Sequence, residues 1–461
     1  MKPRLHIHHF TPQTSLHDLF ARLQHQPWAI LLESAGPQGA DNRFDIISAD
    51  PLATLETRGA TTCLRHGDNI EQQLGDPLAL LASTQQALLG SLDQNDSALP
   101  FIGGALGLFG YDLGRRFERL PTWAIPDIQL PDMAVGIYDW ALLREVATGR
   151  WQLVHWGDEA GLASRLRWLE AHTAFPSTSQ EPFSLTGPWQ SNMSRAEYGD
   201  KFARIQAYLA AGDCYQINLT QRFSAPYQGN EWSAYCALSA ANKAPFSAFI
   251  RLEESAILSL SPERFLLLDG RHIETKPIKG TRPRHPNPVI DRRVAEELAS
   301  ADKDRSENLM IVDLLRNDVG RVSRPGSVCV PHLFAVESFP AVHHLVSTIH
   351  GELDARWQGV DLLRACFPGG SITGAPKIRA MEIIEELEPQ RRNAYCGSIG
   401  YLSQHGRMDT SICIRTLIAE QGQLHCWAGG GIIADSEVDS EYQETYDKVA
   451  RILPLLDALR Q

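Results

Sequence analysis

The order of strand-like and helical segments is the feature that most constrains the fold of this chain. Short apolar runs rich in β-branched residues come in groups, and stretches with helical periodicity stand between those groups. The regular strand–helix–strand spacing of a parallel sheet does not recur along the chain. Antiparallel strands need only short turns between them, so this order favours an α+β body built from layers of largely antiparallel sheet.

A segment rich in Pro, Ser and Thr divides the chain into two regions. Residues 172–190 lack periodicity and predict a connection between an N-terminal region, 1–171, and a larger region, 191–461. Of the 461 residues, 43% are hydrophobic and 21% charged, which excludes collagen-like and disordered chains. We expect both regions to be parts of one compact body.

The net charge of −12 argues against a role in binding nucleic acid or anionic membranes. No run approaches the ~18 uncharged apolar residues of a membrane span. The first residues lack the apolar core of a secretion signal, so we expect a cytoplasmic protein. The cysteines form no CxxC pair, and in a reducing compartment we expect them to be buried free thiols. They are Cys63, Cys214, Cys236, Cys329, Cys366, Cys396, Cys413 and Cys426.

Two short segments contain residues suited to acid and nucleophilic chemistry. Lys279 lies among apolar and glycine residues just after a predicted strand at 271–276. Burial there would lower its pKa and make the neutral amine available as a nucleophile or base. Glu263 lies beside Pro262 and an apolar strand, where burial would keep it protonated, as a general acid must be. Taken alone, each segment fits a charged side chain in a surface loop or turn better than a catalytic role.

Three glutamates predict a site for a hard cation. Glu307 precedes Ile311 and Leu315 at helical spacing, so it lies on the apolar face of a helix predicted at 291–317. Glu441 and Glu444 lie one turn apart on a predicted C-terminal helix. Mg²⁺ prefers carboxylate oxygens and completes its shell with water and with anionic substrate oxygens.

Other interpretations of these residues stay open at this stage. Arginines near Glu307 would also neutralise it, and Glu444 with Lys448 fits a solvated ion pair on a helix. His343, His344 and His350 suggest a transition-metal site, although their spacing is not that of the HExxH motif.

Glycine segments and one arginine predict an anion site. Free backbone N–H groups are expected at 369–374 and at Gly429, Gly430 and Gly431, although tight turns explain these glycines equally well. Arg415 alternates with apolar residues on a strand predicted at 410–419, where it fits either a carboxylate ligand or an edge position. Neither a GxGxxG motif nor a P-loop is present, so nucleotide binding has no support.

Together, these motifs resemble those of chorismate-utilising enzymes, most closely the aminodeoxychorismate synthase component I subfamily. The similarity is dense from about Tyr198 to Leu453 and looser near 31–34 and 43–45. The matching segments are 212–223, 261–265, 277–281, 304–318, 339–347, 367–377, 409–412, 428–432 and 441–445.

The resemblance implies a fold and a set of site residues. The fold is that of anthranilate synthase component I, with two antiparallel sheets packed face to face and helices outside. The implied Mg²⁺ ligands are Glu307 and Glu444, with Glu441 close by. The implied chorismate site consists of Arg415, Tyr401, the amides of Gly429, Gly430 and Gly431, and the lining residues His344 and Thr373.

Two positions divide this family by chemistry. Isochorismate synthases have a lysine base where this chain has Gln216, and an amide cannot activate water. Anthranilate synthases typically have alanine where this chain has Lys279. In the aminodeoxychorismate synthases the lysine has a proposed covalent role at ring carbon C2, with Glu263 protonating the departing C4 hydroxyl. Anthranilate synthase component I and a catalytically silent subunit that binds chorismate or tryptophan are the alternatives.

The resemblance also implies a partner and a second ligand. No cysteine stands in the Gly-x-Cys-x-Gly turn of a glutaminase, so a separate glutamine amidotransferase subunit is expected to supply ammonia. The product would be 4-amino-4-deoxychorismate, on the route to p-aminobenzoate and folate. A family pocket for L-tryptophan would match Ser34, Asp41, Asn42, Arg43, Phe44, Pro245, Phe246 and Ser247.

Overall fold

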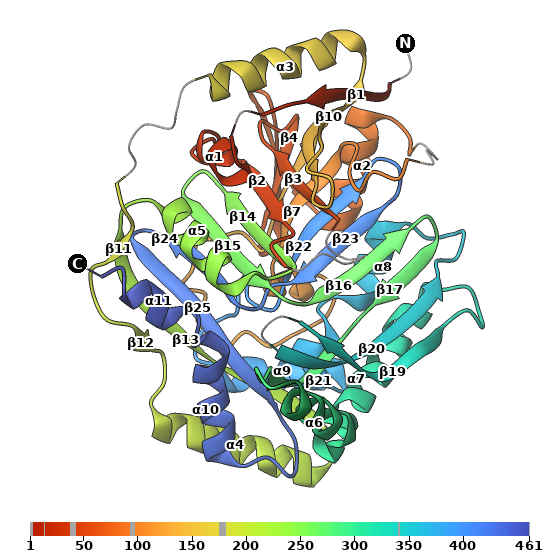
Figure 1. Ribbon diagram of the computed structural model, residues 1–461. Helices are drawn as coiled ribbons and strands as arrows, with labels where there is room; N and C mark the ends of the chain where they lie inside the picture. The colour runs from red at the N-terminus through yellow and green to blue at the C-terminus, as the bar shows by residue number, and fades with distance from the viewer. Residues whose placement is uncertain are drawn as a thin grey trace.

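Two large antiparallel β-sheets form the centre of the molecule, and helices lie around them (Figure 1). The computed structural model describes residues 3–12, 14–36, 43–92, 97–174, 181–339 and 342–460. Within these ranges the first sheet has 13 strands and the second has 12. The α+β class and the two antiparallel sheets are therefore confirmed.

The first sheet contains strands from almost the whole length of the chain. In spatial order its main path is β1 (Arg4–Phe10), β10 (Trp151–Gly157), β9 (Trp140–Glu145), β3 (Phe44–Ser48), β2 (Ile30–Glu33), β14 (Phe246–Arg251), β15 (Ser255–Ser261), β24 (Thr416–Glu420), β25 (Gln423–Ile432), β13 (Gln216–Gln228) and β11 (Ser184–Leu185). Two short strands also pair with β13, namely β12 (Gln190–Ser191) and β21 (Gly374–Ala375).

The second sheet has a similar mixed origin. Its main path is β18 (Ile278–Pro283), β20 (Val342–Glu352), β17 (His272–Thr275), β16 (Arg264–Asp269), β23 (Met408–Ile412), β22 (Ser398–Ser403), β7 (Gly104–Phe109), β8 (Met133–Tyr138), β4 (Ala53–Arg58), β5 (Thr61–His66) and β6 (Asn69–Leu74). Strand β19 (Cys329–Ser338) also pairs with β20.

Helices pack on both sheets. They are α1 (Leu16–Ala21), α2 (Pro77–Leu89), α3 (Glu159–Thr173), α4 (Arg195–Ala211), α5 (Glu231–Asn242), α6 (Pro288–Ser300), α7 (Asp302–Gly320), α8 (Gly359–Cys366), α9 (Lys377–Leu387), α10 (Val438–Val449) and α11 (Leu453–Asp457), with short 3₁₀ turns η1 (Tyr111–Arg116) and η2 (Gly370–Ile372). No helix in the described ranges is long and apolar enough to cross a membrane.

The two-residue periodicity of the strands divides the core into layers. Ile30 and Ile257 of the first sheet share a buried cluster with Leu106 of the second sheet, so this cluster fills the space between the sheets. Their neighbours Leu31 and Leu258 point the other way, into a cluster with α1, α3, α5 and α11. Because these strands are buried on both faces, their sequences are continuous apolar runs and do not alternate between apolar and polar residues.

Both sheets contain strands from before and after residues 172–190. In the first sheet β2 pairs with β14, and in the second β7 pairs with β22. The segment predicted as a connection includes the end of α3, the short strand β11 and the first residue of β12. The strands of the N-terminal and C-terminal regions are thus interleaved within each sheet.

The helix predicted at 291–317 is two helices, and this prediction was wrong. The helix is interrupted at Ala301, which has an extended backbone conformation (φ −68°, ψ 107°). Asp302 and Asp304 follow in the first turn of α7, where their carboxylates stabilise the positive end of a new helix dipole. Helical periodicity alone did not reveal the break, because the apolar pattern resumes after it.

The predicted C-terminal helix that contains Glu441 and Glu444, expected over 437–459, is also divided. Helix α10 ends at Val449, and α11 begins at Leu453 with Pro454 in its first turn. Proline lacks an N–H and is tolerated in a first turn but not in a helix interior. Residues 195–211 have helical spacing with a glycine after them, which predicts a helix, and α4 occupies this segment with a capping box from Ser194 and a left-handed Gly212 at its end.

The prediction that all cysteines are buried is correct for five of the eight. Cys329 is exposed on β19, and Cys63 and Cys236 are half-buried, while all eight are free thiols. Strand β19 pairs with β20 but has a largely exposed burial pattern, which explains the accessible thiol.

Candidate active site

Lys279 and Glu263 meet at the same short turn, η2. The Lys279 ammonium donates to the backbone carbonyl of Ser371 at 3.1 Å, and the Ser371 hydroxyl donates to Glu263 Oε1 at 2.8 Å. Lys279 lies on β18, opposite Leu345 at a β-bulge, and not in a surface loop, which was the alternative that the sequence left open. Glu263 is only 5% exposed. Ser371 therefore links the predicted nucleophile to the predicted acid.

The electrostatics of this pair favour uncharged side chains. Burial raises the pKa of Glu263 to about 7, although the Ser371 hydrogen bond and the Lys279 charge oppose this shift. Burial also lowers the pKa of Lys279, while the negative charge of Glu307 acts in the opposite direction. Both groups thus shift toward the forms that a general acid and a nucleophilic amine require.

Glu441 and Glu444 point their oxygens at one place above β25. A Cβ atom on Gly430 would lie 3.0 Å from Glu441 Oε2 and 3.0 Å from Glu444 Oε1. Glu441 is 2% exposed, and its Oε1 accepts from the Ser436 hydroxyl at 2.6 Å. Its Oε2 is buried without a hydrogen-bond partner among the described residues. A buried carboxylate oxygen in this state is costly unless a cation binds it.

Glu307 on α7 completes the acidic group. Burial raises its pKa, the charges of Lys279 and Lys303 lower it, and Glu441 and Glu444 raise it again. Burial likewise opposes ionisation of Glu444, but the Lys448 ammonium at 2.7 Å lowers the pKa of that carboxyl overall. Oxygen donors alone, together with the unpartnered Oε2, fit a hard divalent cation such as Mg²⁺.

Arg415 lies where the chain passes from one sheet to the other. Strand β23 ends at Ile412 in the second sheet and β24 begins at Thr416 in the first, so the single strand predicted at 410–419 was wrong. Arg415 has a left-handed backbone (φ 51°), and burial lowers its pKa. Its guanidinium has no hydrogen-bond or ion-pair partner in the described ranges, so it is available to an anion.

His344, Thr373 and Gln216 have different surroundings. Burial and then the Arg415 charge lower the pKa of His344 to about 4, and its Nδ1 lies 2.8 Å from the Thr281 hydroxyl. The hydroxyl of Thr373 donates to the Gly369 carbonyl at 3.0 Å. The side chain of Gln216 packs against Gly431 so closely that a Cβ atom at position 431 would overlap with Gln216 Nε2. Its Oε1 is buried and unpartnered among the described residues.

The structure does not bring Tyr401 to this group. Tyr401 is buried on β22 and lines a separate cavity of about 170 Å³ between the sheets. None of Lys279, Glu263, Glu307 and Glu444 lines that cavity. The resemblance placed Tyr401 at the chorismate carboxylates, but its position on β22 directs the side chain into this cavity instead.

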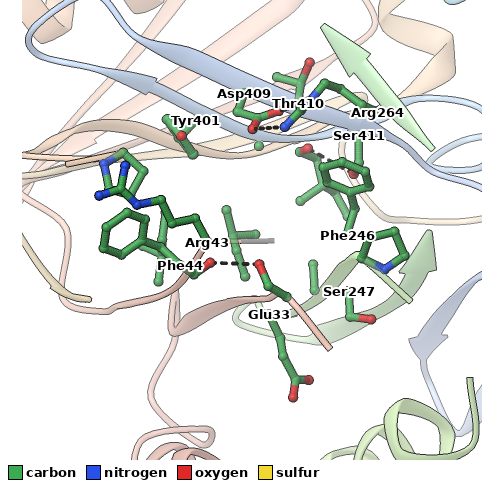
Figure 2. Close-up of a pocket in the computed structure, with 18 of the residues that line it drawn as sticks. Glu33, Arg43, Phe44, Phe246, Ser247, Arg264, Tyr401, Asp409, Thr410 and Ser411 are labelled. Atoms are coloured by element: carbon green, nitrogen blue, oxygen red, sulfur yellow. Dashed lines mark hydrogen bonds and ion pairs between the residues drawn. The ribbon is translucent and has the colours of Figure 1, made fainter. Parts of the chain in front are cut away.

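The cavity instead gathers the residues predicted to bind tryptophan (Figure 2). Its lining includes Ser34, Arg43, Phe44, Pro245, Phe246 and Ser247. Asp41 and Asn42 lie outside the described residues. Within the lining, the Ser34 hydroxyl donates to the Phe44 carbonyl at 2.9 Å, and Arg264 forms an ion pair with Asp409 at 3.0 Å.

The transition-metal alternative at His343, His344 and His350 is also corrected. These histidines do not form one group, because His343 contacts Asp291 at 3.0 Å and His344 faces Thr281. His350 instead contacts Glu274 at 3.1 Å on the neighbouring strand. Side chains at consecutive positions of β20 point to opposite faces of the sheet, so His343 and His344 cannot bind the same metal ion.

Three residues of the site were not predicted. Ser371 belongs to the glycine segment 369–374, which was noted only for its backbone. Lys303 lies 3.4 Å from Glu441, and Lys448 donates to the Gly429 carbonyl as well as pairing with Glu444. Lys448 was recognised only as a helical partner of Glu444, because spacing along a helix does not reveal which strand it packs against.

Comparison of the sequence with known proteins assigns the chain to an enzyme family. Residues 29–454 match the family of chorismate binding enzymes, and the chain belongs to this family. Within it, aminodeoxychorismate synthase component 1 of Klebsiella aerogenes is 60% identical over 439 residues, 95% of this chain and 96% of the relative. The protein of the same name from Escherichia coli K12 is 58% identical over 441 residues, covering 95% of each chain.

A solved structure agrees with this assignment. Anthranilate synthase component I from Streptococcus pneumoniae has a TM-score of 0.79 to this chain at 30% identity, covering 89% of this chain and 92% of the other. The expected resemblance to the aminodeoxychorismate synthase subfamily and the expected fold are both confirmed.

Proposed function

We propose that this chain converts chorismate and ammonia to 4-amino-4-deoxychorismate, which leads to p-aminobenzoate and folate. The observation that carries the proposal is the Lys279–Ser371–Glu263 arrangement, in which burial shifts the amine and the carboxyl toward their uncharged forms. The identity of about 60% to proteins named aminodeoxychorismate synthase component 1 supports the same activity.

The proposed reaction proceeds in two displacements at Lys279 and Glu263. The neutral Lys279 amine attacks ring carbon C2, the two ring double bonds shift, and the C4 hydroxyl leaves as water with a proton from Glu263. Ammonia then attacks C4, the double bonds shift back, and the C2–N bond to Lys279 breaks. Lys279 leaves C2 as the neutral amine, and the new C4 ammonium group loses one proton, which reprotonates Glu263. Dividing one difficult displacement into two is the usual advantage of nucleophilic catalysis.

Binding residues surround this pair. Glu307, Glu441 and Glu444 would hold Mg²⁺, which would bind a substrate carboxylate and withdraw electron density from the ring. The unpartnered guanidinium of Arg415 and the backbone of Gly429–Gly431 would bind chorismate carboxylates. Neutral His344 and buried Thr373 would line the same space.

Ammonia is proposed to come from a separate glutamine amidotransferase subunit. The relatives are named component 1, which implies at least one further component in their assemblies. Alone, the chain should use free ammonia, and more readily at high pH because more of the ammonia is then unprotonated.

Intact-protein mass spectrometry tests the covalent step. The protein is mixed with chorismate and Mg²⁺ without ammonia, and the expected result is an adduct of chorismate minus water that maps to Lys279. Lys279→Ala should not form this adduct, and addition of ammonia should discharge it from the parent protein as aminodeoxychorismate. An adduct of equal yield on both proteins would contradict the role of Lys279.

Product analysis separates the alternatives. Anthranilate synthase releases pyruvate and an aromatic amine, so detection of pyruvate would replace this proposal with that activity. Failure to consume chorismate with Mg²⁺ and ammonia would point to a silent binding subunit. A silent binder has no use for a buried acid beside a neutral amine, which disfavours this alternative.

We also propose that the cavity between the sheets binds L-tryptophan. Phe44 and Phe246 supply aromatic surface there, and Arg43 and Ser34 supply polar groups. Mass spectrometry of denatured, freshly purified protein should detect the amino acid. If none is released and none binds in calorimetry, the assignment of this cavity is wrong.

A further inference from the structure

Strands β17 and β20 pair in the second sheet (Figure 1). Three side chains with metal-binding chemistry gather on these two strands. His350 Nε2 lies 3.1 Å from Glu274 Oε2, and the rings of His350 and His272 have their centroids 4.5 Å apart. One ligand atom from each of the three lies within 4.8 Å of the other two. Such spacing lets the three atoms share one ion.

The strand register holds this group together. Strands β17 and β20 are antiparallel, and Glu274 lies directly opposite His350. Opposite residues share a face, and so do His272 and Glu274, which are two residues apart on one strand. The arrangement therefore depends on sheet pairing and not on the conformation of a loop.

Arg264 fixes the orientation of the carboxylate. Its guanidinium contacts Glu274 Oε1 at 3.1 Å and pairs with Asp409 at 3.0 Å. With Oε1 held in this way, Oε2 points to His350. Outer partners that orient ligands in this manner are a regular feature of metal sites.

We propose that His272, Glu274 and His350 bind a divalent transition metal ion, with Zn²⁺ the best chemical match. Two imidazole nitrogens and one carboxylate oxygen form a common three-ligand set for zinc, and water fills the fourth position because His272 is exposed. The donors differ from the all-oxygen group at Glu307, Glu441 and Glu444, which suits a harder ion.

The position of this site indicates a structural effect. His350 is six residues from His344 on the same strand, which corresponds to about 20 Å of extended chain. An ion there would not touch chorismate, but it would tie β17 to β20 just before the chain continues into β18 with Lys279. We therefore expect zinc to raise thermal stability rather than to take part in the reaction.

Calorimetric titration of the EDTA-treated, desalted full chain with ZnCl₂ in excess Mg²⁺ tests the site. The parent should bind one Zn²⁺ and melt at a higher temperature with it. His272→Asn and His350→Gln should each weaken binding at least about tenfold, since even outer partners contribute that much. Thermal melts without zinc would show that both variants remain folded.

Two neighbouring residues serve as controls. His332→Asn removes an exposed histidine of β19, and Cys329→Ser removes the exposed thiol opposite His350. Both variants should bind zinc as the parent does. The proposal is overturned if the parent binds no zinc, if both cluster variants bind normally, or if binding depends on Cys329 alone.

Discussion

The group around Lys279 and the cavity beside Arg264 are both buried and polar, but they differ in how charges are paired. At the cavity, Arg264 contacts Asp409 at 3.0 Å and Glu274 at 3.1 Å. At the other group, Lys279 donates to a backbone carbonyl, with no carboxylate at ion-pair distance among the described residues. Arg415 likewise has no partner there.

This difference separates charges that hold the fold from charges that await a ligand. A buried ion pair compensates its own desolvation, so removing one member mainly destabilises the fold. A buried group without an ion-pair partner either shifts toward its neutral form, as Lys279 does, or is a cost to the apo protein that an anionic ligand offsets, as at Arg415. We therefore expect changes at the Lys279 group to reduce activity and changes at Arg264 to reduce stability.

The largest expected effect follows Lys279→Ala. Without the amine there is no covalent step, and loss of a nucleophile that acts with its acid as one unit costs at least about 10⁴-fold in kcat. Formation of aminodeoxychorismate from chorismate and ammonia, followed by liquid chromatography, measures it. Urea unfolding should show that the variant is at least as stable as the parent. A rate equal to that of the parent would contradict the proposed role of Lys279 as nucleophile.

Glu263→Gln should have the next largest effect. The amide cannot protonate the leaving hydroxyl, and loss of a general acid lowers the rate by about 10²- to 10⁴-fold. The parent rate should also fall as pH rises through about 7, where Glu263 loses its proton, when measured with saturating unprotonated ammonia. The variant should lack this decline, and an identical decline would assign it to another group.

Arg264→Met should act mainly on stability. Removing the cation takes an ion-pair partner from both Asp409 and Glu274, and breaking a buried pair in this way costs about 3 to 5 kcal/mol in the free energy of unfolding. Arg65→Met is the matched control, since Arg65 and Glu253 form an exposed pair at 3.9 Å and such pairs contribute at most about 1 kcal/mol. Urea unfolding of both variants tests this contrast, and equal losses would contradict it.

The smallest effect concerns the stability contributed by Glu263. Its pKa is about 7 when folded and 4.5 in the unfolded chain, so the folded state binds the proton more tightly. The stability that this carboxyl contributes then falls as pH rises from about 4.5 to 7, by about 3 kcal/mol in total. Glu263→Gln lacks this loss, so its stability relative to the parent should be greater at pH 8 than at pH 4. A pH-independent difference would show that the carboxyl is not buried in its neutral form.

Much of the fold followed from strand periodicity and helix signals. Segment 195–211 has a capping residue before it and a glycine after it, and the structure places α4 there. The break at Ala301 and the passage of 413–415 between the sheets were missed. Local helix or strand propensity does not determine these two features. Each depends on the sheet or helix layer against which the following segment packs, and a single sequence contains no local signal for that packing.

The site was predictable where the chemistry of one residue type was decisive. Lys279, Glu263 and the three glutamates were singled out by charge in apolar surroundings, and the structure brings them to one region. Ser371 was missed because it acts through a hydroxyl and a carbonyl that carry no charge signal. Tyr401 was misplaced because the direction of a side chain from β22 depends on the packing of the second sheet.

The interleaving of strands has a consequence for the synthesis of this protein. Strand β7 pairs with β22, whose first residue follows the last residue of β7 by nearly 290 positions. At about 5 to 20 residues per second, a ribosome needs about 15 to 60 s to deliver that partner. During this time β7 has an open, apolar edge that other chains can join. Newly made copies should therefore depend on chaperones more than a chain of this size with sequential domains would.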